Sequence, residues 1–340
     1  KENPVLEDED IHTAVERLLA EFIDPEIAAK VPTGRSRNDL AVTELRLYLA
    51  SAIDACMADV KKLQEILLTQ ARANQDTVMP GYTHLRRGQP VVFAQYLLAY
   101  FWALDRDRDR LAQARERSLG LALGAGALAG NPFGVDRRRL ADELGFERVI
   151  PNSIDAISSR DHIVEFLSAG AILGTHLSRM AEDLILWSGA EYGFVNIDES
   201  YTTGSSLMPQ KRNPDSLELI RGKSGRLTGN LMALLMIVKG LATGYQRDLQ
   251  EDKEPAFDTL DTLGLVLPVM EGVIRTLQAD GYQELLPCHN GTVVVDAKVG
   301  EVSNKHKPVT DRYGLPSIHL EEVPWTRYEP KAKMLVLDSI

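Results

Sequence analysis

The stretch IVEFLSAGAILGTHLSRMAEDLILW, residues 163–187, decides the fold class. It contains no proline, and its large apolar side chains recur every three or four residues, as at Phe166, Leu177 and Leu184. This spacing predicts one long helix with an apolar face. Residues 40–73, 90–117 and 216–240 have the same character and are also expected to be helices. Because long helices of this kind pack as bundles, the predicted fold class is all-α, a long-helix bundle.

The run at residues 216–240 differs from the others in its small residues. Gly222, Gly225 and Gly229 lie among leucines and methionines, and glycine lets a neighbouring helix approach closely. We therefore expect a central, buried helix. Between the helical runs, residues 32–39, 80–90, 124–134 and 201–214 are rich in Gly, Ser, Thr, Asn and Pro. They are expected to be loops that carry chemistry at the ends of rigid helices.

Composition limits the function classes. The chain of 340 residues has 38 Lys+Arg against 49 Asp+Glu, a formal charge of -11, which argues against nucleic acid as a partner. The longest apolar run, residues 231–238, is too short to cross a membrane, and the first residues lack the order of a signal peptide. Cys56 and Cys288 have neither disulfide-framework nor metal-ligand spacing. We expect a soluble, cytoplasmic protein.

The C-terminal part has a different character. Residues 291–299 (GTVVVDAKV) and 334–340 (MLVLDSI) read as β-type runs separated by charged, proline-containing stretches. The sequence predicts a C-terminal tail of possible β character after about residue 277.

The most informative loop is GSSLMPQKRNPD, residues 204–215. A serine can act as a general base if an ammonium group and backbone N–H groups stabilise its alkoxide, and Lys211 could supply part of that charge. Gly204 and Pro209 suit a loop that closes over a substrate. Taken alone, this segment is also compatible with a structural turn.

This loop resembles the signature of the fumarase/aspartase superfamily, and its extension GSSLMPQKRNPDSLELIRGK resembles the argininosuccinate lyase branch. Residues 33–39 (TGRSRND), 81–90 (GYTHLRRGQP) and 248–255 (DLQEDKEP) match that branch in the expected order. Weaker agreement is found at residues 126–132 and 152–161. The resemblance implies a bundle of the fumarase/aspartase type, with 1–35 as the remnant of an N-terminal domain, 36–277 as the central lyase domain and 278–340 unassigned.

The resemblance also implies an activity. Enzymes of this branch cleave the C–N bond of argininosuccinate by β-elimination to fumarate and arginine, a step of arginine biosynthesis, without a metal or an organic cofactor. Removing the proton next to a carboxylate builds a doubly charged aci-carboxylate, which needs fixed donors and cations. By resemblance Ser205 is the base, and Lys211 and Asn213 stabilise that charge.

The remaining site residues follow from the same resemblance. His84 is a candidate for proton transfer to the departing nitrogen or for orienting a water, and its pair with Thr83 is expected at the substrate. Arg37 and Asn38 match positions that hold substrate carboxylates. The amino-acid portion of the substrate is expected to bind at three further positions: Tyr245, Gln250 and Lys253.

Members of this superfamily are homotetramers in which each active site takes loops from three subunits, and the same is expected here. Some residues depart from the branch pattern, among them Pro32, Leu40, Arg86, Gly88 and Ser159. Leu40 and Arg86 could alter the amine that is accepted, which leaves open a lyase for another N-succinyl amine. A non-catalytic scaffold also stays open, since relatives of this superfamily serve as lens crystallins.

Overall fold

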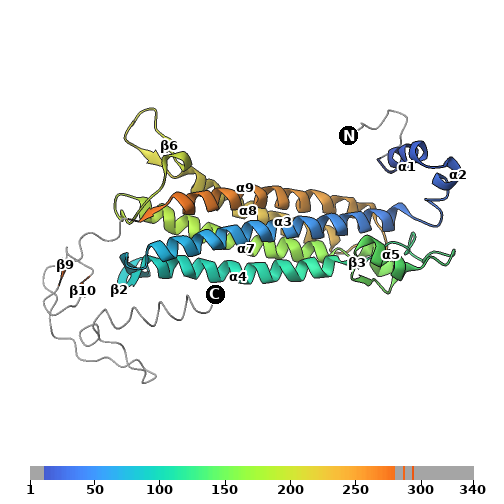
Figure 1. Ribbon diagram of the computed structural model, residues 1–340, viewed down its shortest axis with the longest axis horizontal. Helices are drawn as coiled ribbons and strands as arrows, with labels where there is room; N and C mark the ends of the chain where they lie inside the picture. Colours follow the sequence, from blue (N-terminus) through green and yellow to red (C-terminus); the bar gives the residue numbers. More distant parts are fainter. Residues whose placement is uncertain (1–10, 280–285, 288–292, 295–340) are drawn as a thin grey trace, which may run out of the picture. The chain divides into compact units, whose positions relative to one another are not determined.

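The computed structural model describes residues 11–279, 286–287 and 293–294 of the chain. Long helices dominate it (Figure 1). The helices are α1 (Ile11–Phe22), α2 (Pro25–Ala28), α3 (Arg37–Ala73), α4 (Phe93–Ser118), α5 (Arg137–Leu144), α6 (Ser153–Ser158), α7 (Asp161–Ser188), α8 (Asp215–Val238) and α9 (Lys253–Thr276), with short 3-10 turns η1 (Glu199–Tyr201) and η2 (Arg247–Asp252).

The strands are short and pair two by two. β3 (Gly120–Leu121) and β4 (Arg148–Val149) are parallel. The other pairs are antiparallel: β1 (Val78–Thr83) with β2 (Arg86–Val92), β5 (Val195–Asn196) with β8 (Gln278–Ala279), β6 (Thr203–Gly204) with β7 (Arg212–Asn213), and β9 (Leu286–Pro287) with β10 (Val293–Val294).

The helical runs expected from apolar spacing are confirmed as α3, α4, α7 and α8. Two features were not expected. Residues 253–276 form α9 although Pro268 lies inside the helix, and residues 80–90 belong to the β1–β2 hairpin rather than to an irregular loop. Of the expected β-type runs in the tail, Val293–Val294 is a described strand, and residues 334–340 lie outside the described residues.

The chain divides into two compact units. Unit 1 is made of Lys1–Cys56, Arg110–Gly170 and Thr228–Leu260. Unit 2 is made of Met57–Asp109, Ala171–Leu227 and Asp261–Ile340. Each unit therefore takes one portion of each long helix, and in each the chain segments that pack together are distant in sequence.

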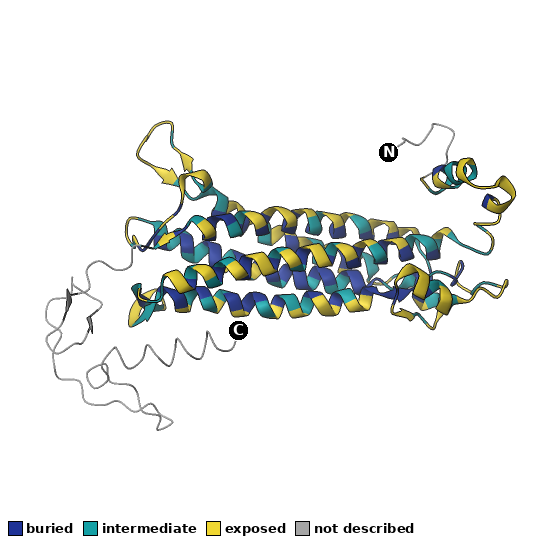
Figure 2. Cartoon of the chain, viewed as in Figure 1, coloured by how far each residue is buried: buried dark blue, intermediate teal, exposed yellow. Residues whose placement is uncertain are grey.

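In unit 2, polar contacts and buried leucines join the helices. Gln64 Nε2 of α3 donates to the carbonyl oxygen of Phe101 in α4 at 3.3 Å. Tyr100 of α4 donates to Asp183 of α7. Between the contacts, fully buried side chains such as Leu63 fill the core. Figure 2 shows this pattern along α3 and α4, with buried residues on one side of each helix and exposed residues on the other.

In unit 1, α3 meets α9 through the rings of Tyr48 and Phe257, whose centroids are 5.3 Å apart. Asn230 of α8 donates through Nδ2 to Asp258 of α9 at 2.7 Å. The short helix α5 is fixed at its start by Asp136, whose side chain accepts backbone N–H groups. The first two contacts join α3 and α8 to α9, the helix that begins at Lys253.

Helix α8 is not buried all round, contrary to the expectation for residues 216–240. Leu217, Leu227 and Leu234 are buried, whereas Gly222 and Gly229 are exposed. A single chain thus covers one face of α8 only.

None of the described helices combines the length and apolar character that crossing a membrane requires.

Candidate active site

His84 lies at the tip of the β1–β2 hairpin in unit 2. Thr83 and Arg86 face each other in the register, so His84 and Leu85 form a two-residue turn. Both have left-handed backbone angles, with φ of 54° and 56°. Such angles are the ones a tight hairpin turn needs, and they are costly for residues with a Cβ. His84 and Thr83 are exposed, so the strained turn presents both side chains outward.

Ser205 begins the loop between β6 and β7 in unit 2. The two strands pair Thr203 with Asn213 and Gly204 with Arg212, which closes residues 205–211 into a loop. Ser205 Oγ accepts the backbone N–H of Met208 at 3.1 Å. The Ser205 hydroxyl oxygen thus faces one backbone N–H donor within its own loop.

The base of this loop is firmly held, while its tip is open. Thr203 donates to Asp215, and Arg212 Nη2 donates to Glu199 at 3.0 Å. Leu207 at the tip is 85% exposed, and Lys211 is exposed as well. Such a loop, with an anchored base and an exposed tip, can move toward a bound molecule without unfolding the helices.

Arg37 and Asn38 form the first turn of α3 in unit 1. Arg37 is exposed, and its Nη2 donates to Thr13 Oγ1 at 3.0 Å. Asn38 is half-buried, and its backbone N–H donates to Ser36 Oγ at 3.2 Å. The two polar side chains therefore start from a backbone that is fixed by local hydrogen bonds.

Tyr245, Gln250 and Lys253 lie around η2 in unit 1. Tyr245 is half-buried against the apolar cluster of Val42, Ala122, Ala125, Ala156 and Ile157. Gln250 is exposed. Lys253 Nζ lies 2.9 Å from Asp252 Oδ1, and the fully buried Asp252 also accepts from Arg160. Sequence reasoning missed Asp252 and Arg160, although both lie in segments it had singled out.

The site residues expected from the sequence are divided between the units. Unit 1 holds Arg37, Asn38, Tyr245, Gln250 and Lys253, and unit 2 holds Thr83, His84, Ser205, Lys211 and Asn213. Within the described part of unit 2, no hydrogen bond joins the His84 turn to the Ser205 loop. The expected site residues of each unit are therefore described by themselves.

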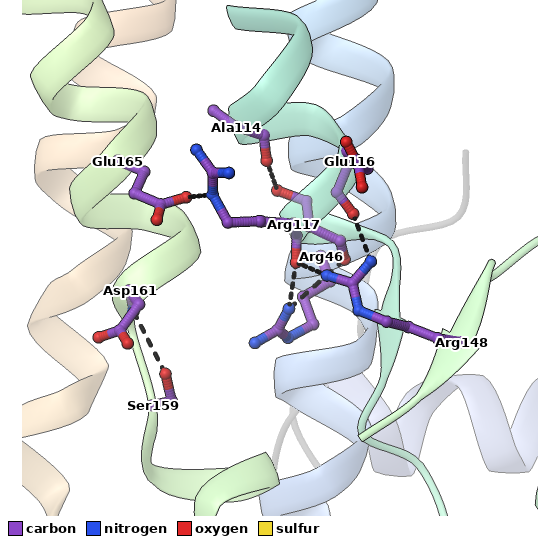
Figure 3. Close-up of polar contacts among 9 residues, drawn as sticks. Arg46, Ala114, Glu116, Arg117, Arg148, Ser159, Asp161 and Glu165 are labelled. Carbon is purple, nitrogen blue, oxygen red and sulfur yellow. Dashed lines mark hydrogen bonds and ion pairs between the residues drawn. The ribbon is translucent and has the colours of Figure 1, made fainter. Parts of the chain in front are cut away.

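A separate cavity of about 280 Å³ in unit 1 is lined by charged residues that sequence reasoning did not single out. Arg148 Nη1 donates to Glu116 O at 3.0 Å, and Arg46 Nη1 donates to Arg117 O at 3.1 Å (Figure 3). Both guanidinium groups thus satisfy carbonyl oxygens at the C-terminal end of α4, where positive charge is favourable. Burial, aided by nearby cations, lowers the pKa of Arg46 to about 10. We interpret these arginines as helix caps.

Comparison with known proteins extends these observations. A family model described as Lyase matches residues 5–229. The argininosuccinate lyase of Herpetosiphon aurantiacus is 57% identical over 273 residues, which is 80% of this chain and 60% of that protein. The chain spans about three fifths of the length of the curated relatives it matches.

Solved structures support the fold class. A crystal structure of EDDS lyase in complex with formate has a TM-score of 0.72 and 32% identity, covering 78% of this chain and 53% of that one. A class II fumarase from Schistosoma mansoni has a TM-score of 0.68 at 20% identity, covering 74% and 58%, a likeness in fold alone. The expected bundle of the fumarase/aspartase type is confirmed. Since the family model covers more than half of its length, this chain belongs to the lyase family.

Proposed function

We propose that this chain cleaves the C–N bond of argininosuccinate by β-elimination, giving fumarate and arginine in arginine biosynthesis. The observation that carries the proposal is the 57% identity to an argininosuccinate lyase over 273 residues. The family match at residues 5–229 spans the positions of Arg37, His84 and Ser205. The proposed reaction uses neither a metal nor an organic cofactor, as the resemblance implies.

Ser205 is the proposed base. It removes the proton from the carbon next to a succinyl carboxylate, and the electron pair then forms the double bond of fumarate as the C–N bond breaks. The Met208 N–H that lies 3.1 Å from Ser205 Oγ supports this role, because it would stabilise an alkoxide there. Lys211, on the same loop, adds positive charge.

Other residues hold charge and deliver a proton. Lys211 and Asn213 stabilise the aci-carboxylate that builds up as the proton leaves carbon. His84 gives a proton to the departing nitrogen or orients a water that does so, and its exposed position on the hairpin tip is compatible with either. The nitrogen leaves as part of the guanidinium group of arginine, because the proton that it receives balances the electron pair that it takes from the broken C–N bond.

The residues of unit 1, together with Thr83, are proposed to bind the rest of the substrate. Arg37 and Asn38 hold a succinyl carboxylate, for which a guanidinium fork is well suited. The amino-acid portion carries its own carboxylate and ammonium groups and is held by three residues around η2: Tyr245, Gln250 and Lys253.

The test is to incubate the purified chain with argininosuccinate and to follow fumarate by its ultraviolet absorbance. Ser205→Ala is expected to lower kcat by about 10²–10⁴-fold, the range typical for loss of a general base. Ser200→Ala, a change at an exposed serine outside the loop, is the matched control and should keep the wild-type rate. Unchanged activity in Ser205→Ala would show that the base is another group.

A second candidate is a lyase for a different N-succinyl amine. Arg86, one of the departures from the branch pattern, is exposed and directly opposite Thr83 in the β1–β2 register. An added cation beside a proposed substrate residue can change which leaving amine is accepted. A structural neighbour named EDDS lyase, 32% identical, supports variety of substrate on this fold. Fumarate release from a panel of succinylated amines would separate the candidates. No fumarate from any of them would favour the scaffold alternative.

We further propose a homotetramer whose active sites take loops from different subunits. The exposed face of α8 supports it. Met232 is 52% and Met236 60% exposed, and a Cβ built on Gly225 or Gly229 meets open space. A face of small and apolar residues suits close packing against helices of other copies.

Oligomer size tests this assembly directly. Met232→Glu should reduce the tetramer to smaller species in analytical ultracentrifugation while far-ultraviolet circular dichroism stays helical. Leu144→Glu on α5 makes the same kind of change at a residue that is 37% exposed and should leave the assembly unchanged. A monomeric wild-type chain would contradict the tetramer.

We also propose that the protein works in the cytoplasm, without nucleic-acid or membrane partners. The formal charge of -11 disfavours binding to polyanions. A chain with only two cysteines, of which Cys56 is buried, is typical of a reducing compartment.

A further inference from the structure

A buried carboxylate lies directly beside the two residues proposed to hold a succinyl carboxylate. Asp39 follows Arg37 and Asn38 in α3, and its side chain is 0% exposed. Burial raises the pKa of Asp39, while hydrogen bonds from the backbone N–H groups of Gly126 and Ser36 oppose that rise. Because a buried charge is costly unless it is hydrogen-bonded, the partners of Asp39 indicate what it holds in place.

One oxygen of Asp39 closes the first turn of α3. Oδ1 accepts the backbone N–H of Ser36 at 3.0 Å, and Ser36 Oγ in turn accepts the backbone N–H of Asn38 at 3.2 Å. This reciprocal pair is a capping box, which satisfies N–H groups that a helix start would otherwise leave unpaired. The backbone of Arg37 and Asn38 is enclosed by it.

The other oxygen ties this turn to a distant loop. Oδ2 accepts the N–H groups of Gly124 at 3.0 Å and Gly126 at 2.8 Å. Both glycines have left-handed φ, +88° and +60°, so their N–H groups converge as in the anion-binding turns of other proteins. A Cβ at Gly124 would lie 2.9 Å from Arg137, whose Nε donates to Leu123 O at 3.0 Å. The loop of Gly124 and Gly126 is thus held by Asp39 on one side and by Arg137 on the other.

A second hydrogen bond secures the start of the same segment. Asn131 Nδ2 donates to the carbonyl oxygen of Gly34 at 3.0 Å. The segment from Gly34 to Asp39 is therefore fastened at both ends to residues 124–131. The exposed Arg37 lies between the two fastening points, so its backbone is fixed, and its guanidinium donates to Thr13 Oγ1 at 3.0 Å.

We propose that Asp39 is a positioning residue, which holds Arg37 and Asn38 in the geometry that binds a substrate carboxylate by fixing the first turn of α3 to the loop of Gly124 and Gly126. The inference rests on the proposed function and deepens it. Asp39 itself does not touch substrate; it acts through the two residues that precede it.

Asp39→Asn in the full chain tests this role. Asparagine keeps the shape and one acceptor oxygen but turns an NH₂ group toward backbone N–H donors. The KM for argininosuccinate should rise about tenfold or more, with kcat changed much less, because substrate binding rather than chemistry is disturbed. The control is Asp136→Asn. Asp136 caps α5 by accepting the N–H groups of Arg138 and Arg139, a duty that asparagine performs equally well, so KM should stay at the wild-type value.

An unchanged KM in Asp39→Asn, or a fall in kcat alone, would overturn the proposal. If Asp39→Asn does not fold, Asn131→Ala loosens the same segment from its other end, and its KM must then rise. Hydrogen–deuterium exchange separates this test from the proposed function. Even if the wild type releases no fumarate, the amides of Ser36, Gly124 and Gly126 should exchange faster in Asp39→Asn than in Asp136→Asn. Equal exchange rates would sink the positioning role.

Discussion

At the scale of single residues, buried charges organise unit 1. Asp252 is fully buried, accepts from the guanidinium of Arg160, and lies 2.9 Å from Lys253 Nζ. The Asp252 carboxylate thus holds Lys253, which is expected to contact substrate. It also neutralises the charge of Arg160, which is itself buried. An arrangement of this kind is sensitive to the loss of either partner, because the remaining charge stays buried without compensation.

This sensitivity gives a stability prediction. Asp252→Asn should lower the free energy of unfolding by about 3–5 kcal/mol, measured by urea denaturation, because Arg160 is left unpaired with a side chain that is 3% exposed. The control is Asp54→Asn, which breaks an ion pair with Arg115 whose side chains are 49% and 34% exposed. That change should cost less than about 1 kcal/mol. Similar losses in the two variants would contradict this account.

The sequence indicates candidate site residues, which stay predictions, but it does not indicate the groups that support them. Ser205, His84 and Arg37 were identified because their motifs resemble a known branch, not because their spacing alone indicated a site. The supporting contacts join residues far apart in sequence, such as Asp39 with Gly124. A hydrogen bond between two loops depends on their tertiary placement, which apolar spacing does not encode.

At the scale of elements, the β1–β2 hairpin carries unusual strain. Leu85 has a φ of 56° and is 70% exposed, so its side chain gains little from packing while its backbone is left-handed. The second position of a two-residue hairpin turn strongly favours glycine. The hairpin therefore holds an unfavourable residue next to His84, a pattern found where a turn is shaped for function.

Replacing that residue should stabilise the protein. Leu85→Gly is expected to raise the free energy of unfolding by about 1 kcal/mol, because glycine removes the left-handed penalty of a residue with a Cβ. Leu207→Gly serves as the comparison, since Leu207 is 85% exposed but does not have positive φ. It should be neutral or destabilising, because added backbone freedom favours the unfolded chain. Destabilisation by Leu85→Gly would mean that its side chain packs in a way that outweighs the strain.

Long helices could be predicted from the sequence, and short or proline-containing elements could not. The apolar spacing of α3, α4, α7 and α8 persists over many turns, which makes the helical period unmistakable. Helix α9 tolerates Pro268, whose ring removes one backbone hydrogen bond but does not end the helix in this packed setting. The hairpin was hidden because Pro80, Gly81 and Pro90 read as loop residues.

At the scale of the whole molecule, stability should depend on a histidine that takes no part in the proposed chemistry. His162 is fully buried, and burial, together with the nearby charges of Arg46 and Arg160, holds its pKa well below the ordinary value. The His162 imidazole stays neutral in the folded protein at pH values where it binds a proton in the unfolded chain. Its contribution to the free energy of unfolding is therefore fully present above about pH 6.5 and is lost as the pH falls below that value.

The pH dependence of unfolding checks this sign. Below about pH 6.5 the wild type should lose up to about 1.4 kcal/mol of unfolding free energy per pH unit from this group, measured by denaturant titration. His162→Gln, which cannot be protonated, should show a shallower fall over the same range. Carboxyl groups such as Asp183, whose pKa is raised by burial, are common to both proteins and cancel in the difference. Parallel pH profiles would refute the assignment.

The division of the proposed site residues between two units bears on the whole assembly. Arg37 and Lys253 belong to unit 1, while His84 and Ser205 belong to unit 2. An active site drawn from several copies would use both sets without requiring them to meet within one chain. The proposal of a shared active site, like the proposal of the substrate, assumes that the chain acts as a lyase of argininosuccinate.

The most direct test of that central claim is the product balance from argininosuccinate, followed by proton nuclear magnetic resonance. We predict that fumarate and arginine appear together in equal amounts with the wild type, and that neither appears with Ser205→Ala on the same timescale. Failure of the folded, assembled wild-type protein to release either product would contradict it, whether or not fumarate is formed from another succinylated amine.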